Sequence, residues 1–143
     1  MVLEFDREKI SKLISELNNS LNELKEIAVF KKNDFLSNKY MIASAKYFLI
    51  TVIEAAVDIC NHIISSNKFR IPDDYKDTFR IMAEERILEP KFSEKLMEMA
   101  KFRNRLVHIY WEVDDEVIYQ ILKKDLQDIG KFRDKIIEAL NLK

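Results

Sequence analysis

The sequence predicts an all-α protein, a bundle of four long helices and one short helix. The chain of 143 residues contains only one glycine and two prolines, so few positions favour the tight turns that a protein built from β-hairpins needs. Apolar residues recur at steps of three and four along most of the chain, which is the helical period. Hydrophobic residues make up 48% of the sequence, enough for one core, and we expect a single domain over residues 1–143.

Two long helices are expected in the N-terminal half of the chain. Asp6 is suited to cap a helix over about residues 7–30, whose apolar positions follow the helical period. Asp34 is suited to cap a second helix over about residues 35–65, which is apolar nearly all round from residue 47 to residue 64. A helix that is apolar on all sides belongs in the middle of a bundle.

A short helix and two long helices are expected in the C-terminal half. The segment Asp73-Asp74-Tyr75 is typical of the start of a capped helix, here a short one ending near residue 86, and the Glu89-Pro90 pair separates it from the next. A fourth helix is expected from about residue 92 to residues 108–111, and a last helix over about residues 116–140. Gly130 costs about 1 kcal/mol relative to alanine inside a helix, so it predicts a close approach or a bend.

Composition argues against a secreted or membrane protein. The N-terminus carries charges of both signs and no apolar run, which is unlike a signal peptide. The apolar stretch of residues 41–64 includes four ionisable side chains, which a membrane span rarely carries: Lys46, Glu54, Asp58 and His62. The single cysteine, Cys60, is interpreted as a small buried hydrophobe. We therefore expect a cytoplasmic protein with no membrane contact.

Several kinds of chemistry lack the residues that they need. The two histidines, His62 and His108, are far apart in the sequence, and Cys60 and His62 would point away from each other on a helix, so no metal site is predicted. A single glycine leaves no phosphate-cradling loop, and no serine lies in a recognisable nucleophile elbow. No cofactor is expected. The net charge of −1 means that any nucleic-acid binding must come from a local basic patch.

One segment combines cations, a histidine and aromatic rings: Lys101, Arg103, Arg105, His108, Tyr110 and Trp111. Arginine is suited to bind a phosphodiester, and histidine exchanges a proton near neutral pH. Together they would support RNA cleavage by the ribose 2′-hydroxyl, with His108 as base or acid and Arg103 stabilising the anionic transition state. A structural interpretation is better supported by composition and spacing alone: the helix dipole favours a basic C-terminus, His108 caps the helix and Trp111 lies in the core.

Helical geometry limits how Arg103 and His108 can cooperate. At about 100° per residue they lie about 140° apart on a regular helix, whereas Asn104 and His108 share a face. Either the helix unwinds before His108, or the site combines residues from two chains. A lone histidine with no second proton carrier also fits a site formed across a two-fold axis, to which each chain contributes one histidine.

The segment Arg103-Asn104-Arg105-Leu106-Val107-His108 resembles the R-x4-H signature of HEPN domains. With Ile109-Tyr110 it resembles the R-x4-H-x-Y motif of HepT toxins, which are encoded with MntA-type nucleotidyltransferase antitoxins. The resemblance extends over about residues 34–135. It includes residues 54–64, which are similar to the long second helix of the family, and residues 72–79, which are similar to its short-helix entry.

This resemblance implies a HEPN-type homodimer with its motifs facing each other across a cleft. It implies a metal-independent ribonuclease toxin that cleaves tRNA or mRNA. Arg103 and His108 would be the catalytic pair, and Asn104 would orient or polarise them. Tyr110 matches the tyrosine to which the cognate antitoxin adds AMP, an anionic group that would repel RNA beside the cleft.

The roles of three polar residues on the second predicted helix stay open. Glu54 and Asp58 lie one turn apart, and one or both could position the arginines of the motif or form ordinary salt bridges of the bundle. His62 lies one turn further on the same face and is interpreted as a structural, hydrogen-bonded histidine.

Two alternatives to a ribonuclease toxin also stay open. The first is a non-catalytic helical subunit or partner of a nucleotidyltransferase, which predicts a tight complex with that enzyme and no effect of His108→Ala on growth. The second is a purely structural bundle, which predicts that Arg103, His108 and Tyr110 are packed away from any cleft.

Overall fold

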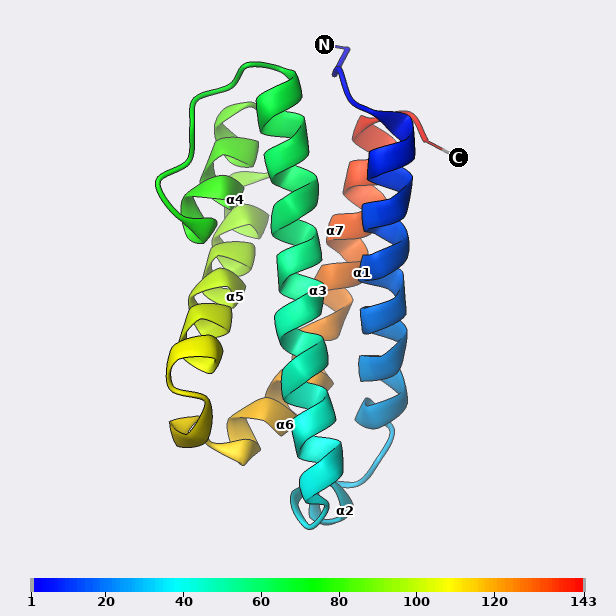
Figure 1. Ribbon diagram of the computed structural model, residues 1–143, viewed down its shortest axis with the longest axis vertical. Coiled ribbons are helices and arrows are strands. Elements are labelled where there is room, and N and C mark those ends of the chain that lie inside the picture. Colours follow the sequence, from blue (N-terminus) through cyan, green and yellow to red (C-terminus); the bar gives the residue numbers. More distant parts are fainter. Residues whose placement is uncertain (1, 143) are drawn as a thin grey trace.

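The computed structural model describes residues 2–142, and every regular element in this range is helical (Figure 1). The elements are α1 (Arg7–Ala28), α2 (Lys32–Leu36), α3 (Lys39–Ser66), α4 (Tyr75–Glu84), α5 (Pro90–His108), the 3-10 turn η1 (Tyr110–Glu112), α6 (Asp115–Lys124) and α7 (Leu126–Ala139). The all-α prediction is therefore confirmed. The structure adds one short helix, α2, and divides the predicted last helix in two.

Helix α3 is the centre of the bundle, as its sequence predicts. It contacts α1 and α2, which precede it in the chain, and also α4, α5, α6 and α7, which follow it (Figure 1). Cys60 on this helix is fully buried, which raises the pKa of its thiol well above the ordinary value. Among residues 2–142, α3 alone is long and apolar enough to cross a membrane, but 56% of its most apolar window is buried inside the fold. Its apolar surface therefore serves the core.

Helix capping explains where the first elements begin. Asp6 accepts a hydrogen bond from the Lys9 amide at 3.1 Å and starts α1, as predicted. The prediction that Asp34 caps the second long helix is wrong, because Asp34 lies inside α2. Asn38 caps α3 instead, since its Oδ1 accepts hydrogen bonds from the amides of Tyr40 and Met41 at 3.2 and 3.1 Å.

The break in the last predicted helix lies at Asp125, between α6 and α7, and not at Gly130. This break lets α6 lie across one end of the bundle while α7 runs along α1 (Figure 1). The expected close approach or bend at Gly130 is wrong. The φ angle of Gly130 is not positive, and an added Cβ atom would meet only Arg133 Nη2 within 4 Å, at 3.8 Å.

The N-terminal segment is tied to the end of α3 by polar side chains. The Asp6 amide donates a hydrogen bond to His62 Nε2 at 2.9 Å, and Asn67 exchanges two hydrogen bonds with the backbone of Glu4. Partial burial, followed by the charge of Lys9, lowers the pKa of His62. The interpretation of His62 as a structural, hydrogen-bonded histidine is therefore confirmed.

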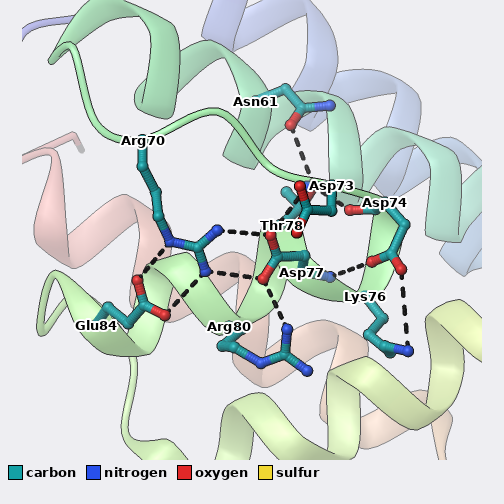
Figure 2. A network of polar contacts seen from close by, with 9 residues as sticks. All are labelled: Asn61, Arg70, Asp73, Asp74, Lys76, Asp77, Thr78, Arg80 and Glu84. Carbon is teal, nitrogen blue, oxygen red and sulfur yellow. Dashed lines mark hydrogen bonds and ion pairs between the residues drawn. The ribbon is translucent and has the colours of Figure 1, made fainter.

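A network of charged side chains fixes helix α4, and Figure 2 shows it. Asp77 is almost fully buried and accepts two hydrogen bonds from Arg70, at 2.7 and 2.8 Å, and one from Arg80 at 2.8 Å. The Arg70 hydrogen bonds hold the pKa of Asp77 well below its usual range. Asp74, the predicted cap, accepts from the Asp77 amide at 2.7 Å. The network thus holds the first turn of α4, which begins with Tyr75.

Candidate active site

Arg103 on α5 is held by three neighbours and is only 14% exposed. Its Nη2 forms an ion pair with Glu54 of α3, and its Nη1 donates to Asn104 Oδ1 at 3.1 Å. The ring of Tyr75, the first residue of α4, lies 4.7 Å from the guanidinium carbon, a cation–π distance. Nε of Arg103 is buried without a hydrogen-bond partner. Residues from α3, α4 and α5 therefore orient one guanidinium group.

The two acidic candidates on α3 behave differently. Glu54 forms the ion pair with Arg103. For Asp58, partial burial and then the negative charges of Glu54 and Glu16 raise the pKa, the opposite of what an arginine partner does to a carboxyl group. Of these two acidic residues, we therefore assign only Glu54 a role in orienting Arg103.

His108 occupies the last turn of α5 and is exposed to solvent. Helix α5 continues without interruption through His108, and Ile109 is its C-cap. The helix therefore does not unwind before His108, and within one chain Arg103 and His108 project about 140° apart. The first of the two arrangements that the spacing allows, a helix unwound before His108, is therefore not present in this chain.

A buried lysine holds the segment that follows His108. Lys46 of α3 is 6% exposed, and its Nζ donates to the Tyr110 carbonyl at 3.2 Å and lies 3.5 Å from Asp115 Oδ1. The same ammonium group is 4.5 Å from the centroid of the Tyr110 ring. Sequence reasoning did not connect Lys46 with the motif. The available signal was that Lys46 is the only lysine or arginine in the apolar stretch of residues 41–64, and a buried cation usually has a specific partner.

Trp111 is 90% exposed, so the interpretation that it lies in the core is wrong. The residues near the end of the motif that do lie in the core are Leu106 and Val113. Tyr110 is half-buried and its ring contacts the Trp111 ring edge-to-face, with the centroids 5.1 Å apart. The alternative of a purely structural bundle predicts that Arg103, His108 and Tyr110 are packed away from any cleft. Arg103 and Tyr110 are half-buried, and His108 is exposed.

The cavities of a single chain do not bring Arg103 and His108 together. One of about 920 Å³ lies between the α4–α5 connection and α7, and another of about 350 Å³ lies between α3, α5 and the α6–α7 junction. Neither is lined by Arg103 or His108. Within residues 2–142 there is also no group of three or more histidine, cysteine or acidic side chains suited to hold a metal ion.

Comparison with known proteins places this chain in a defined family. The model of the family "HepT-like: Ribonuclease HepT-like" matches residues 17–136. The chain is 31% identical to the mRNA nuclease HepT of Shewanella oneidensis over 83 residues, which are 58% of this chain and 62% of that protein. It is 27% identical to the tRNA nuclease HepT of Aphanizomenon flos-aquae over 107 residues, 75% of this chain and 73% of that protein.

Solved structures show the same fold. The chain superposes on a tri-AMPylated Shewanella oneidensis HEPN toxin in complex with an MNT antitoxin, with a TM-score of 0.83, 25% identity and coverage of 91% of this chain and 96% of that one. YutE of Bacillus subtilis, described as a cytosolic protein of unknown function, gives a TM-score of 0.83 at 21% identity, covering 98% of this chain and 94% of that one. The fold is therefore that of HEPN domains. Within this class, the chain belongs to the ribonuclease HepT-like family.

Proposed function

We propose that this protein is a metal-independent endoribonuclease toxin that acts on tRNA or mRNA. The observation that carries the proposal is the R-x4-H segment on an uninterrupted helix, where Arg103 is oriented by Glu54, Tyr75 and Asn104 while His108 is exposed. Arginine and histidine in these states match the needs of RNA cleavage: a fixed cation for the phosphate and an accessible group that exchanges protons. Relatives named as RNA nucleases support the same reaction.

The reaction requires only groups of the RNA and of the protein. The ribose 2′-hydroxyl attacks the adjacent phosphorus, the bond to the 5′-oxygen breaks, and the products are a 2′,3′-cyclic phosphate and a 5′-hydroxyl. His108 takes the proton of the attacking hydroxyl or supplies one to the leaving oxygen. Arg103 stabilises the negative charge that develops on the phosphate, and Asn104 orients its guanidinium.

The active form proposed is a homodimer with a composite site. Arg103 and His108 project about 140° apart on α5, so one chain does not aim both groups at one phosphate. Placing two copies of the motif across a two-fold axis brings the Arg103 of one chain opposite the His108 of its partner. We place this homodimer in the cytoplasm, as YutE, a protein of the same fold, is described as cytosolic.

An MNT-type nucleotidyltransferase is the proposed antitoxin, and Tyr110 the proposed AMP acceptor. Support comes from the Shewanella toxin, which is described as tri-AMPylated and bound to an MNT antitoxin. Tyr110 follows His108 by two residues and is only half-buried. An AMP group there would add negative charge and bulk beside His108, which would repel and block RNA.

Cleavage of RNA by the purified, unmodified protein in the presence of a chelator tests the function. His108→Ala and Arg103→Ala are each expected to lower the cleavage rate by about a hundredfold or more. His62→Gln is the matched control, because His62 is a hydrogen-bonded structural histidine and glutamine preserves the acceptor. No cleavage and no growth inhibition by the wild-type protein would refute the ribonuclease proposal and favour a non-catalytic partner of the transferase. Intact mass after co-expression with an MNT-type nucleotidyltransferase tests modification, which is expected to disappear in Tyr110→Phe.

A further inference from the structure

Trp111 is the only tryptophan of the chain, and its ring is exposed yet held by structured neighbours. It belongs to η1, which Lys46 anchors through the Tyr110 carbonyl at 3.2 Å. The Tyr110 ring contacts Trp111 edge-to-face at 81°, and the Lys46 ammonium group lies over the Tyr110 ring. Burial of an indole is favourable by its area, so a ring that is 90% exposed on an anchored segment indicates a surface that a ligand covers.

The charges around Trp111 are arranged by sign. Lys101, Arg105 and His108 are spaced by four and three residues, so they project from the same side of α5, and all three are exposed. Lys101 also forms an exposed ion pair with Glu98, at 3.3 Å, where the run of basic residues begins. We call them the basic stripe. Helix α5 leads this stripe directly to η1. The acidic residues Glu112 and Asp114, which follow Trp111 in the sequence, are also exposed. A polyanion is therefore attracted along α5 and repelled by the acidic residues that follow Trp111.

We propose that Trp111 is a base-stacking residue for single-stranded RNA. In this arrangement an unpaired base lies on the indole ring while the sugar–phosphate backbone follows the basic stripe. Stacking on aromatic side chains is a principal way in which proteins hold unpaired RNA bases, and it tolerates any sequence. The backbone before Trp111 is already anchored by Lys46, so little backbone freedom is lost on binding. The proposal rests on the ribonuclease function, to which it adds a site for the nucleotide next to the cleaved bond.

Intrinsic fluorescence provides a direct test, because Trp111 is the sole tryptophan. The wild-type protein is titrated with a short unstructured 2′-O-methyl RNA, which lacks the attacking hydroxyl and stays uncut, while the anisotropy of a dye on the RNA reports binding independently. Binding is expected to quench the tryptophan emission. Trp111→Ala is expected to weaken binding by about 5- to 150-fold, the range found when a stacking ring is removed. Trp111→Phe is expected to retain most of the affinity.

Two control variants separate stacking from charge and from general surface effects. Arg105→Ala is expected to weaken binding and to reduce the slope of log Kd against log salt by about 0.7 to 1, whereas Trp111→Ala leaves this slope unchanged. Tyr40→Ala, a 74% exposed aromatic residue at the start of α3, is expected to bind RNA as the wild type does.

Equal binding by Trp111→Ala and wild type, or RNA binding without any change in emission, would overturn the proposal. So would an emission change that follows protein concentration or added transferase but not RNA, because the ring would then be covered by protein. These outcomes differ from failure of the proposed function. A wild-type protein that cuts RNA with an unchanged KM in Trp111→Ala refutes stacking alone, while stacking without any cleavage of unmodified RNA refutes the ribonuclease alone.

Discussion

The guanidinium group of Arg103 is constrained by charge, by a hydrogen bond and by an aromatic ring. Glu54 supplies the charge, Asn104 the hydrogen bond and Tyr75 the ring. Glu54 belongs to α3, Tyr75 to α4, and Asn104 is the next residue of α5. The orientation of Arg103 therefore depends on the packing of these three helices. An arginine ordered in this way needs little reorganisation when a phosphate arrives.

Glu54→Gln tests whether this order matters for catalysis. Glutamine keeps the size and one acceptor of glutamate but removes the charge, so Arg103 should lose its preferred direction. We expect kcat for RNA cleavage to fall by up to about a hundredfold, the effect of a small misplacement of a catalytic group, with little change in KM.

Asp58→Asn is the matched control, one turn along the same face of α3 from Glu54. Because Asp58 forms no ion pair with Arg103 and its pKa is raised by burial, its neutralisation should leave kcat unchanged. An equal loss of activity in both variants would show a general effect of charge on α3, and would contradict a specific role of Glu54.

At the scale of elements, the short connection around η1 determines how the motif ends. Helix α5 stops at His108, and Lys46 then draws the Tyr110 carbonyl and Asp115 toward α3. This contact turns the chain from α5 into α6. It also leaves His108 and Trp111 on the surface while their neighbours Leu106 and Val113 are buried.

Helix α7 contains the single glycine, and its surroundings make Gly130→Ala a stabilising substitution. Gly130 lies inside the helix without positive φ, and an added methyl group would make only an ordinary contact with Arg133 at 3.8 Å. Alanine favours the helix over glycine by about 1 kcal/mol, and we expect the free energy of unfolding to rise by about this amount. Urea unfolding followed by circular dichroism measures it. A decrease would mean that a partner chain lies too close to Gly130 for a methyl group.

At the scale of the whole molecule, one chain separates the two groups that the proposed reaction needs together. Helix α5 is uninterrupted, and the two cavities described above include neither Arg103 nor His108. The proposed composite site resolves this separation by using the Arg103 of one chain with the His108 of its partner.

Mixing two inactive variants tests the composite site. When Arg103→Ala and His108→Ala homodimers exchange subunits, each mixed dimer has one site with an intact arginine and an intact histidine. With random exchange about half of the dimers are mixed, so cleavage should recover to about a quarter of the wild-type rate. Mass spectrometry of the native dimers verifies the exchange. If Arg103 and His108 of the same chain form the site, mixing restores nothing, since every site then lacks one group.

Signals between near neighbours in the chain were sufficient for the all-α class, for the central helix and for the starts of three helices. Asp6, Asp74 and Asp114 each cap the helix that was expected after them, because a cap bonds to an amide only two or three residues away. The cap of α3 was misjudged because Asp34 and Asn38 are both residue types suited to this role.

The features that the sequence did not predict were decided by tertiary packing. The break at Asp125, the exposure of Trp111, the ion pair of Glu54 with Arg103 and the anchoring of Tyr110 by Lys46 all depend on residues far apart in sequence. Local pattern gives the face of a helix on which a residue lies, but not which residue of another helix meets it. That depends on how the helices cross and on which polar groups must find partners once they are buried.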